Sequence, residues 1–146
     1  MSRVGNREQG TGNGEQGTGN RERGTGNREQ MVSDYRELKV WQMSKTLCRR
    51  VYELLRKFPD EERYALCDQL RRAVVSVPSN IAEGNGRAST SEYVRFLSIA
   101  RGSLFEVRTQ LELAEEFGYI KVPEDVQSMM EQIAKMLYAL MCKLKG

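Results

Sequence analysis

The sequence predicts an all-α fold, an antiparallel up-down-up-down four-helix bundle that follows a disordered N-terminal tail. Two observations lead to this prediction. After residue 33, four segments carry apolar residues at alternating spacings of three and four, which places those residues on one face of a helix. Short breaks rich in Gly, Pro and acidic residues separate the segments, and helices joined by short loops pack most simply as antiparallel neighbours. No segment requires a strand, so we expect one folded domain over residues 34–146.

The tail differs from the rest of the chain in composition. Residues 5–30 repeat every seven positions, reading GNREQGT, GNGEQGT, GNRERGT and GNREQ. Each full repeat has two Gly and no apolar residue, so it offers no seam for a coiled coil, and its backbone entropy opposes a helix. The five Arg of residues 1–30 are nearly balanced by four Glu, which leaves little attraction for the phosphates of RNA. We therefore expect a disordered Gly-rich heptapeptide-repeat tail over residues 1–33, with a translated DNA repeat upstream of a start at Met31 as a simple origin.

The first two helices are predicted from their apolar faces and from the break between them. Pro59 and the acidic residues after it separate the two helices, because acidic side chains suit a helix N-terminus. Pro78 lies inside the second pattern and removes a backbone donor, but the apolar face continues beyond it, so we expect a kink rather than an end. The two faces consist of Val40, Leu47, Val51, Leu54 and Phe58, with Ser44 filling one place, and of Leu66, Leu70, Ala73, Val77 and Ile81.

The third and fourth helices have the clearest signals at their ends. The Gly-rich stretch at residues 84–86 ends the second helix, and Ser89 with Glu92 predicts a capping box for the third. Gly118 is the expected glycine just beyond the third helix, and Pro123 opens the fourth. Their apolar faces consist of Tyr93, Leu97, Ala100, Leu104, Val107, Leu111 and Ala114, and of Val126, Met130, Ile133, Leu137, Leu140 and Leu144.

The absence of histidine from the 146 residues makes catalysis the minority hypothesis. Histidine is the commonest general base near neutral pH, the usual partner of a Ser or Cys nucleophile and a frequent metal ligand. A di-metal site in a four-helix bundle uses Glu-x-x-His pairs, which this chain lacks. Cys48, Cys67 and Cys142 have no CxxC spacing, and we interpret them as reduced and structural. We expect no enzymatic activity, no cofactor and no metal, with a hydrolase that uses buried carboxylates as the remaining alternative.

No stretch of the sequence is suited to a membrane. No run of about 18 apolar residues is present, and the N-terminus has no hydrophobic segment of the secretory kind. We therefore expect a soluble cytoplasmic protein with no membrane contact.

Positive charge is concentrated on the first predicted helix. Six basic residues and one acidic residue lie between Lys39 and Phe58, a net charge of +5, whereas residues 31–146 have 18 basic and 16 acidic residues, a net charge of +2. A basic stripe that includes an aromatic ring suits nucleic acid, because Lys and Arg neutralise phosphates while a ring stacks on a base. A solvated helix face is the competing interpretation. The candidate nucleic-acid-binding residues are Lys45, Arg49, Arg50, Tyr52, Arg56 and Lys57.

The third helix carries an unusual set of residues opposite its apolar face. A helical projection places Arg95, Ile99, Gly102, Glu106 and Leu113 there. Glycine costs about 1 kcal/mol relative to Ala inside a helix, but it lets a second backbone approach closely. Contact with another subunit explains both the glycine and the large aliphatic side chains, whereas a small exposed apolar patch is the alternative.

Several sequence blocks resemble those of the bacterial four-helix bundle protein family, whose members include proteins encoded by intervening sequences within large-subunit ribosomal RNA genes. The blocks are LKVWQ, FP, QLRRA, SNIAEG, Arg87, and FLSIARGSLFE through GYI, and the match covers roughly residues 36–142. The resemblance implies an antiparallel four-helix bundle, a homopentameric ring as in related structures, and no catalytic activity. The fold is also similar to that of the accessory variability protein of diversity-generating retroelements, a basic pentamer that binds nucleic acid and a reverse transcriptase.

The motif residues of the resemblance map to the end of the second helix and the middle of the third. We interpret them as polar packing or subunit contacts rather than as a reaction centre. They are Asn80, Glu83, Gly84, Gly102, Ser103 and Glu106.

The leading hypothesis is thus a non-enzymatic homo-oligomer, expected to be a pentamer, that binds RNA or DNA mainly through its first helix. The competing hypothesis is an adaptor that docks a partner such as a polymerase or reverse transcriptase without contacting nucleic acid itself. Salt-dependent binding to a polynucleotide distinguishes the two.

Overall fold

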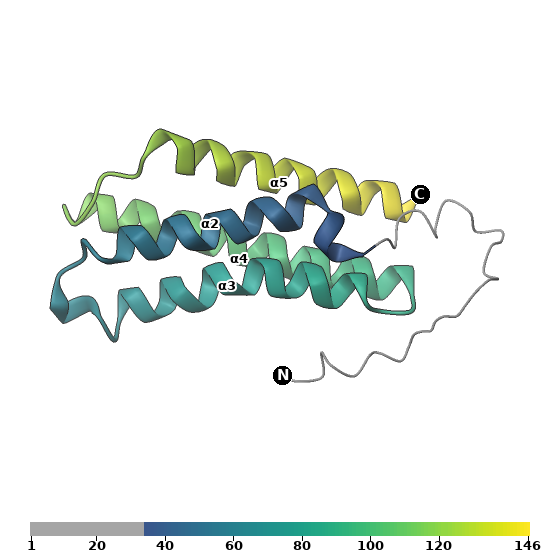
Figure 1. Cartoon of the computed structure of the whole chain (residues 1–146), viewed down its shortest axis with the longest axis horizontal. Helices are drawn as coiled ribbons and strands as arrows, with labels where there is room; N and C mark the ends of the chain where they lie inside the picture. The colour runs from purple at the N-terminus through teal and green to yellow at the C-terminus, as the bar shows by residue number, and fades with distance from the viewer. Residues whose placement is uncertain (1–33) are drawn as a thin grey trace.

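The computed structural model describes residues 34–146, so the predicted disordered tail of residues 1–33 lies outside the described residues. Those residues form four α-helices and two short 3-10 helices, with no strand among them, which confirms the all-α four-helix prediction. The chain reverses direction at each connection between α-helices, so consecutive helices are antiparallel (Figure 1). The elements are η2 (Tyr35–Glu37), α2 (Lys39–Leu55), η3 (Asp60–Glu62), α3 (Leu66–Asn85), α4 (Thr90–Glu116) and α5 (Glu124–Lys145).

Each helix packs mainly against two others. α2 contacts α3 and α5, and α4 contacts the same two helices, with the most extensive packing between α3 and α4. In Figure 1, α2 and α3 lie toward the viewer, α4 lies behind them and α5 runs along the top. α2 and α4 therefore occupy opposite corners of the bundle and present separate faces to solvent.

The predicted apolar faces form the core. All seven predicted residues of α4, from Tyr93 to Ala114, are buried, and full burial of a Leu or Val side chain contributes roughly 1.5–3 kcal/mol. Leu66, Leu140 and Leu144 are only partly buried, because they lie near helix ends where fewer neighbours cover them. Ser44 is fully buried among apolar side chains, and its hydroxyl donates a hydrogen bond to the carbonyl oxygen of Trp41 at 2.8 Å. This bond satisfies the one polar group in the first apolar face.

At the ends of α4, one half of the predicted capping box forms and the predicted glycine lies just beyond the helix. The hydroxyl of Ser89 accepts a hydrogen bond from the backbone N–H of Glu92 at 3.1 Å, which caps the helix. Gly118 has φ of 82°, and the N–H of Tyr119 reaches back to the carbonyl of Ala114 at 2.9 Å. This is the C-terminal arrangement that favours glycine, because its left-handed backbone is strained for other residues.

Pro78 lies inside a continuous helix, since α3 runs from Leu66 to Asn85. Proline has no N–H, so the carbonyl four residues earlier, that of Val74, loses its intrahelical partner. The thiol of Cys48 in α2 lies 3.2 Å from this carbonyl oxygen and donates a hydrogen bond to it. A neighbouring helix thus satisfies the group that the proline leaves free, which lets α3 continue without an unpaired buried carbonyl.

Gly84 sits at the closest approach of α3 and α4. It is buried, and a Cβ atom added there would lie 2.8 Å from the Cβ of Phe96 and 3.2 Å from the carbonyl oxygen of Tyr93. α3 includes Gly84, and Gly86 is the C-cap residue of this helix. Because Gly84 has no side chain, α3 and α4 can approach closely at this point.

Candidate nucleic-acid interface

The outer face of α2 carries most of the predicted basic residues. Lys45, Arg49, Arg56 and Lys57 are exposed, and the ring of Tyr52 is 41% exposed. The spacing of three to four residues along this face follows from burial of Leu47, Val51 and Leu54 on the opposite side. The structure therefore exposes five of the six candidates. The charged candidates differ, however, in whether an acidic side chain pairs with them.

Three of the exposed cations are not compensated by a nearby acid. Among residues 34–146, no carboxylate lies within ion-pair distance of Lys45, Arg56 or Lys57. Arg49 pairs with Glu53 at 3.1 Å, and both side chains are largely exposed, so this pair contributes little to stability. A phosphate could replace that carboxylate at small cost. Within residues 34–146, the face thus has three cations without an acidic partner and one that is weakly held.

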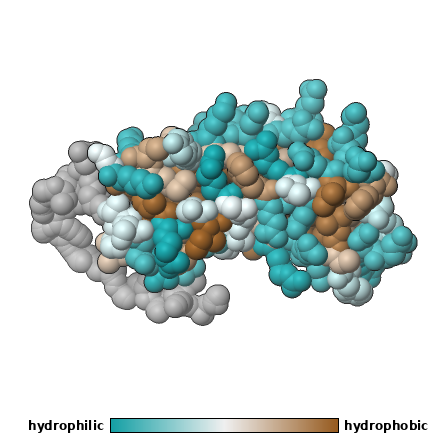
Figure 2. Space-filling view, turned by 180° about the vertical axis from the view of Figure 1, so that it is seen from behind, coloured by the Kyte–Doolittle hydropathy of each residue, from teal (hydrophilic) through white to brown (hydrophobic). Residues whose placement is uncertain are grey.

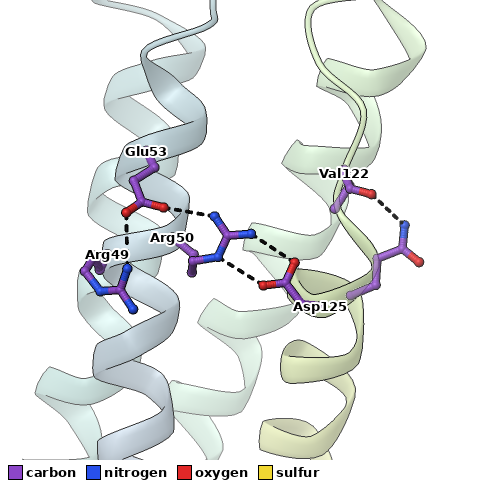
Figure 3. A network of polar contacts seen from close by, with 6 residues as sticks. Arg49, Arg50, Glu53, Val122 and Asp125 are labelled. Carbon is purple, nitrogen blue, oxygen red and sulfur yellow. Dashed lines mark hydrogen bonds and ion pairs between the residues drawn. The ribbon is translucent and has the colours of Figure 1, made fainter.

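Arg50 has a different role from the other candidates. Its guanidinium binds both carboxylate oxygens of Asp125 in α5, at 2.9 and 3.1 Å, and also Glu53 at 2.9 Å (Figure 3). The bonds to Arg50 lower the pKa of both Asp125 and Glu53, and the bond to Asp125 does most to raise the pKa of the guanidinium. Only 23% of the Arg50 side chain is exposed. Arg50 therefore ties α2 to α5, and its charge is already neutralised.

The structure adds aromatic rings to the predicted site. The ammonium group of Lys45 lies 4.8 Å from the centroid of the Trp41 ring, and the ring of Tyr35 meets Trp41 edge to face at 5.1 Å. The guanidinium of Arg36 stacks over Tyr35 at 5.1 Å. A row of two rings between two cations therefore begins before α2 and continues along its first turns. The contact between Trp41 and Lys45 can be inferred from the sequence, because residues four apart lie on the same helix face. The contact between Tyr35 and Trp41 cannot, because it depends on how η2 places Tyr35 beside α2.

Further cations come from the segment after α2 and from α3. Tyr52 and Arg56 line a shallow hollow of about 300 Å³ together with Arg63, Cys67 and Arg71. Arg71 pairs with Asp68 at 3.0 Å, and Arg63 lies 3.9 Å from Asp60. Sequence reasoning missed Arg63 and Arg71 for this site because only the antiparallel packing of α2 and α3 brings them beside Tyr52.

The family-motif residues gather along the outer seam between α3 and α4. The amide nitrogen of Asn80 donates to the carbonyl and hydroxyl oxygens of Ser76, both at 2.8 Å, and the hydroxyls of Ser76 and Ser103 lie 2.8 Å apart. Glu83 in α3 pairs at 2.7 Å with Arg87, which lies just beyond the end of that helix. Of these bonds, the one between Ser76 and Ser103 joins α3 to α4, and none joins a nucleophile to a general base.

A second polar group lies farther along the same seam. The amide nitrogen of Gln110 donates to Gln69 in α3 at 3.1 Å and to Glu106 at 3.3 Å. The amide oxygen of Gln110 is buried and accepts no hydrogen bond from the described residues. A buried acceptor without a partner is costly, so Gln110 lowers the stability of this seam.

The outer face of α4 is open, as the sequence predicted. A Cβ atom added to Gly102 would have nothing within 4 Å. Ile99 and Leu113 on the same side are 40% and 42% exposed, and the exposed Arg95 pairs with Glu92 at 3.6 Å. Figure 2, seen from behind, shows apolar side chains gathered in patches among polar ones on the side where α4 lies.

Other classes of site find little support within residues 34–146. No group of three or more acidic, Cys or His side chains there is arranged to hold a metal ion. No helix of the described part is long and apolar enough to cross a bilayer. The three cysteines are unpaired, and burial raises the pKa of the Cys48 thiol to about 11, which makes it a poor nucleophile near neutral pH.

Comparison with known proteins gives a family and a solved structure. The family model described as 23S rRNA-intervening sequence protein matches residues 36–139. A protein of unknown function from the S23 ribosomal protein family of Bacteroides thetaiotaomicron is 24% identical, with a TM-score of 0.64, over 70% of this chain and 97% of that protein, which supports the fold. Curated proteins yielded no match. Since the family model covers most of the described helices, the chain belongs to the 23S rRNA-intervening sequence protein family.

Proposed function

We propose that this protein is a non-enzymatic, cytoplasmic homo-oligomer that binds RNA or DNA through the outer face of α2. The observation that carries this proposal is the combination of uncompensated cations with accessible rings on one face. Lys45, Arg56 and Lys57 have no acidic partner among residues 34–146, and Tyr52 and Trp41 lie on the same helix.

This combination suits a nucleic acid better than a protein partner. Phosphates attract free cations and release their own counterions when neutralised, and this supplies affinity without sequence preference. Rings beside those cations can stack on unpaired bases, which favours single-stranded segments. Arg50 takes no part in this contact, because it is held by Asp125 and Glu53.

Self-assembly forms the second part of the proposal. The open Gly102 and the exposed Ile99 and Leu113 all lie on the outer side of α4. A second copy packed there would cover the aliphatic side chains and approach the glycine backbone closely. Repetition around a ring, expected to be a pentamer from the family resemblance, would sum the fields of several α2 faces.

An adaptor that docks a polymerase or reverse transcriptase remains a second candidate. The exposed aliphatic side chains of α4 favour it, since a nucleic acid gives them no partner. Under this alternative, the α2 face is merely solvated.

The test is a charge reversal on α2 with a matched control. Lys45→Glu, Arg49→Glu and Arg56→Glu in one variant should weaken binding of a single-stranded RNA at least tenfold, about 1.4 kcal/mol, with helical circular dichroism unchanged. The control reverses three exposed lysines elsewhere, Lys121, Lys143 and Lys145, and so has the same net charge.

The two variants separate a local site from a general effect of charge. Fluorescence anisotropy should show weak binding only for the α2 variant. Equal affinities in the two variants would contradict the assignment to α2, and no binding by the wild type at low salt would favour the adaptor.

A further inference from the structure

The outer face formed by α4 and α5 has two halves of opposite charge. Two contacts fix how the helices lie beside each other on this face: Arg101 donates to the carbonyl of Ala134 at 3.2 Å, and the carboxylate of Glu115 accepts from the N–H of Val122 at 2.8 Å. The first contact lies near the middle of both helices and the second at their connecting loop. The half of the face around the first contact carries basic residues, and the half beside the connecting loop carries acidic residues.

The acidic half is a groove beside the α4–α5 connection. Its volume is about 760 Å³, and its floor includes the buried side chains of Leu111, Val122 and Met130. Apart from Arg108, its charged rim consists of carboxylates, those of Glu112, Glu115, Glu116, Glu124 and Glu131. No Lys or Arg of the described residues pairs with any of these five acids. The groove is therefore a surface of net negative charge over an apolar base, with five acids and one arginine on its rim.

The basic half is a ridge of rings and guanidinium groups. The guanidinium of Arg101 lies 5.0 Å from the centroid of the Phe105 ring and 5.4 Å from that of Tyr138, and Arg108 lies 5.3 Å from Phe105. Phe105 is 44% exposed and Tyr138 is 58% exposed. Neither arginine has a carboxylate partner among residues 34–146. The same face thus combines a cationic aromatic ridge with an anionic groove.

We propose that this α4–α5 face pairs with the same face of a second copy through a two-fold axis perpendicular to the helices. Such an axis makes the helices of the two copies antiparallel. If the axis passes near Arg108, between the two halves of the face, each ridge lies against the groove of the other copy. The rings of Phe105 and Tyr138 then cover the apolar floor, while Arg101 meets the acidic rim. A surface that is complementary to itself in this way favours an isologous pair.

The charge pattern favours a second copy over other occupants. A basic peptide would satisfy the groove but leave the cationic ridge exposed, and a nucleic acid would satisfy the ridge but be repelled by five carboxylates. Only a partner with both signs in the reverse order satisfies both halves. This contact uses a different face from the α2 surface and from Gly102, so it goes beyond the proposed function.

The test measures the mass of the full chain by light scattering after size exclusion. We expect Phe105→Ser to halve the mass of the wild-type assembly, whereas Tyr64→Ser, which removes an 81% exposed ring from the segment between α2 and α3, should leave it unchanged. Glu112→Lys with Glu116→Lys should weaken the pairing at least tenfold. Adding Arg101→Glu should recover part of the pairing, because the new carboxylate then meets the two lysines introduced on the rim of the other copy's groove.

The outcomes also separate this contact from the proposed ring. If Phe105→Ser leaves the mass unchanged while Gly102→Leu reduces it, the two-fold pairing is wrong and the ring stands. If Phe105→Ser halves the mass while Gly102→Leu has no effect, the pairing stands and the ring interface is wrong. A Phe105→Ser variant of unchanged mass that instead loses RNA affinity assigns the ridge to nucleic acid and likewise overturns the pairing.

Discussion

The outer faces of α2 and α4 are made by helices of similar design but offer very different surfaces. Both helices bury one apolar face in the same core and lie at opposite corners of the bundle. α2 exposes several positive side chains. Among residues 34–146, no acidic side chain pairs with Lys45 or Arg56. α4 exposes Ile99, Phe105 and Leu113 at 40–44%.

The difference leads us to propose different kinds of partner for the two corners. Exposed charges of one sign interact with a polyanion over several ångströms and remain well solvated when it is absent. Exposed aliphatic and aromatic side chains gain free energy only when another surface covers them closely. We therefore assign nucleic acid to the α2 side and other copies of the chain to the α4 side.

The largest expected effect tests the inner side of α4. Gly84→Val should lower the free energy of unfolding by roughly 2–4 kcal/mol, because the added side chain collides with the backbone of Tyr93 and the Cβ of Phe96. Urea denaturation followed by circular dichroism measures this change. Gly102→Ala is the matched control on the open side, and it should be neutral or slightly stabilising. Equal losses in the two variants would contradict the contrast between the inner and outer sides.

A smaller effect is expected when the outer side of α4 is changed. Gly102→Leu should raise the dissociation constant of the ring contact at least tenfold, about 1.4 kcal/mol, because the new side chain fills the space that a second backbone needs. Light scattering should then show nothing larger than a pair of subunits. The fold should survive, since no atom lies within 4 Å of the new Cβ. An assembly of unchanged mass would move the ring interface to another face.

An effect of similar size concerns the link from α2 to α3. Cys48→Ala should lower the free energy of unfolding by about 1–2 kcal/mol, because the carbonyl of Val74 then has neither a thiol nor an N–H from the residue at position 78. Cys48→Ser retains a donor and should lose less. Urea denaturation of the two variants gives the comparison, and equal losses would mean that packing, rather than the hydrogen bond, matters here.

The same thiol predicts a dependence on alkaline pH. Burial raises the pKa of Cys48 to about 11 from an ordinary value of 9.0, so the folded state holds the thiol proton more tightly than the unfolded state. Its contribution to stability is complete below pH 9 and is lost as the pH rises toward 11. The Cys48→Ala variant should lack this part of the alkaline loss, which denaturation at pH 8 and pH 10 would reveal.

Much of the fold was readable from local spacing. Alternating steps of three and four placed the core residues on the correct faces, and Ser89 and Gly118 marked the ends of α4, because both signals depend only on residues within a turn or two. Pro78 also signalled a free carbonyl at Val74. Its partner Cys48 could not be inferred, since 26 residues separate the two.

The candidate site was less predictable for the same reason. Arg50 was grouped with the other cations because its partner Asp125 lies 75 residues away in the sequence. Arg63 and Arg71 join Tyr52 only through the packing of α2 against α3. A sequence pattern therefore locates cations on a helix face, whereas pairing between helices decides which of them remain free.

The most direct measurement of the central claim is the salt dependence of RNA binding by the wild type. If three or more cations of α2 contact phosphates, the logarithm of the binding constant for a single-stranded RNA should fall with the logarithm of the salt concentration with a slope of about 2 or steeper. Fluorescence anisotropy from low to physiological salt gives this slope. A constant affinity across that range, or no binding at low salt, would contradict the account.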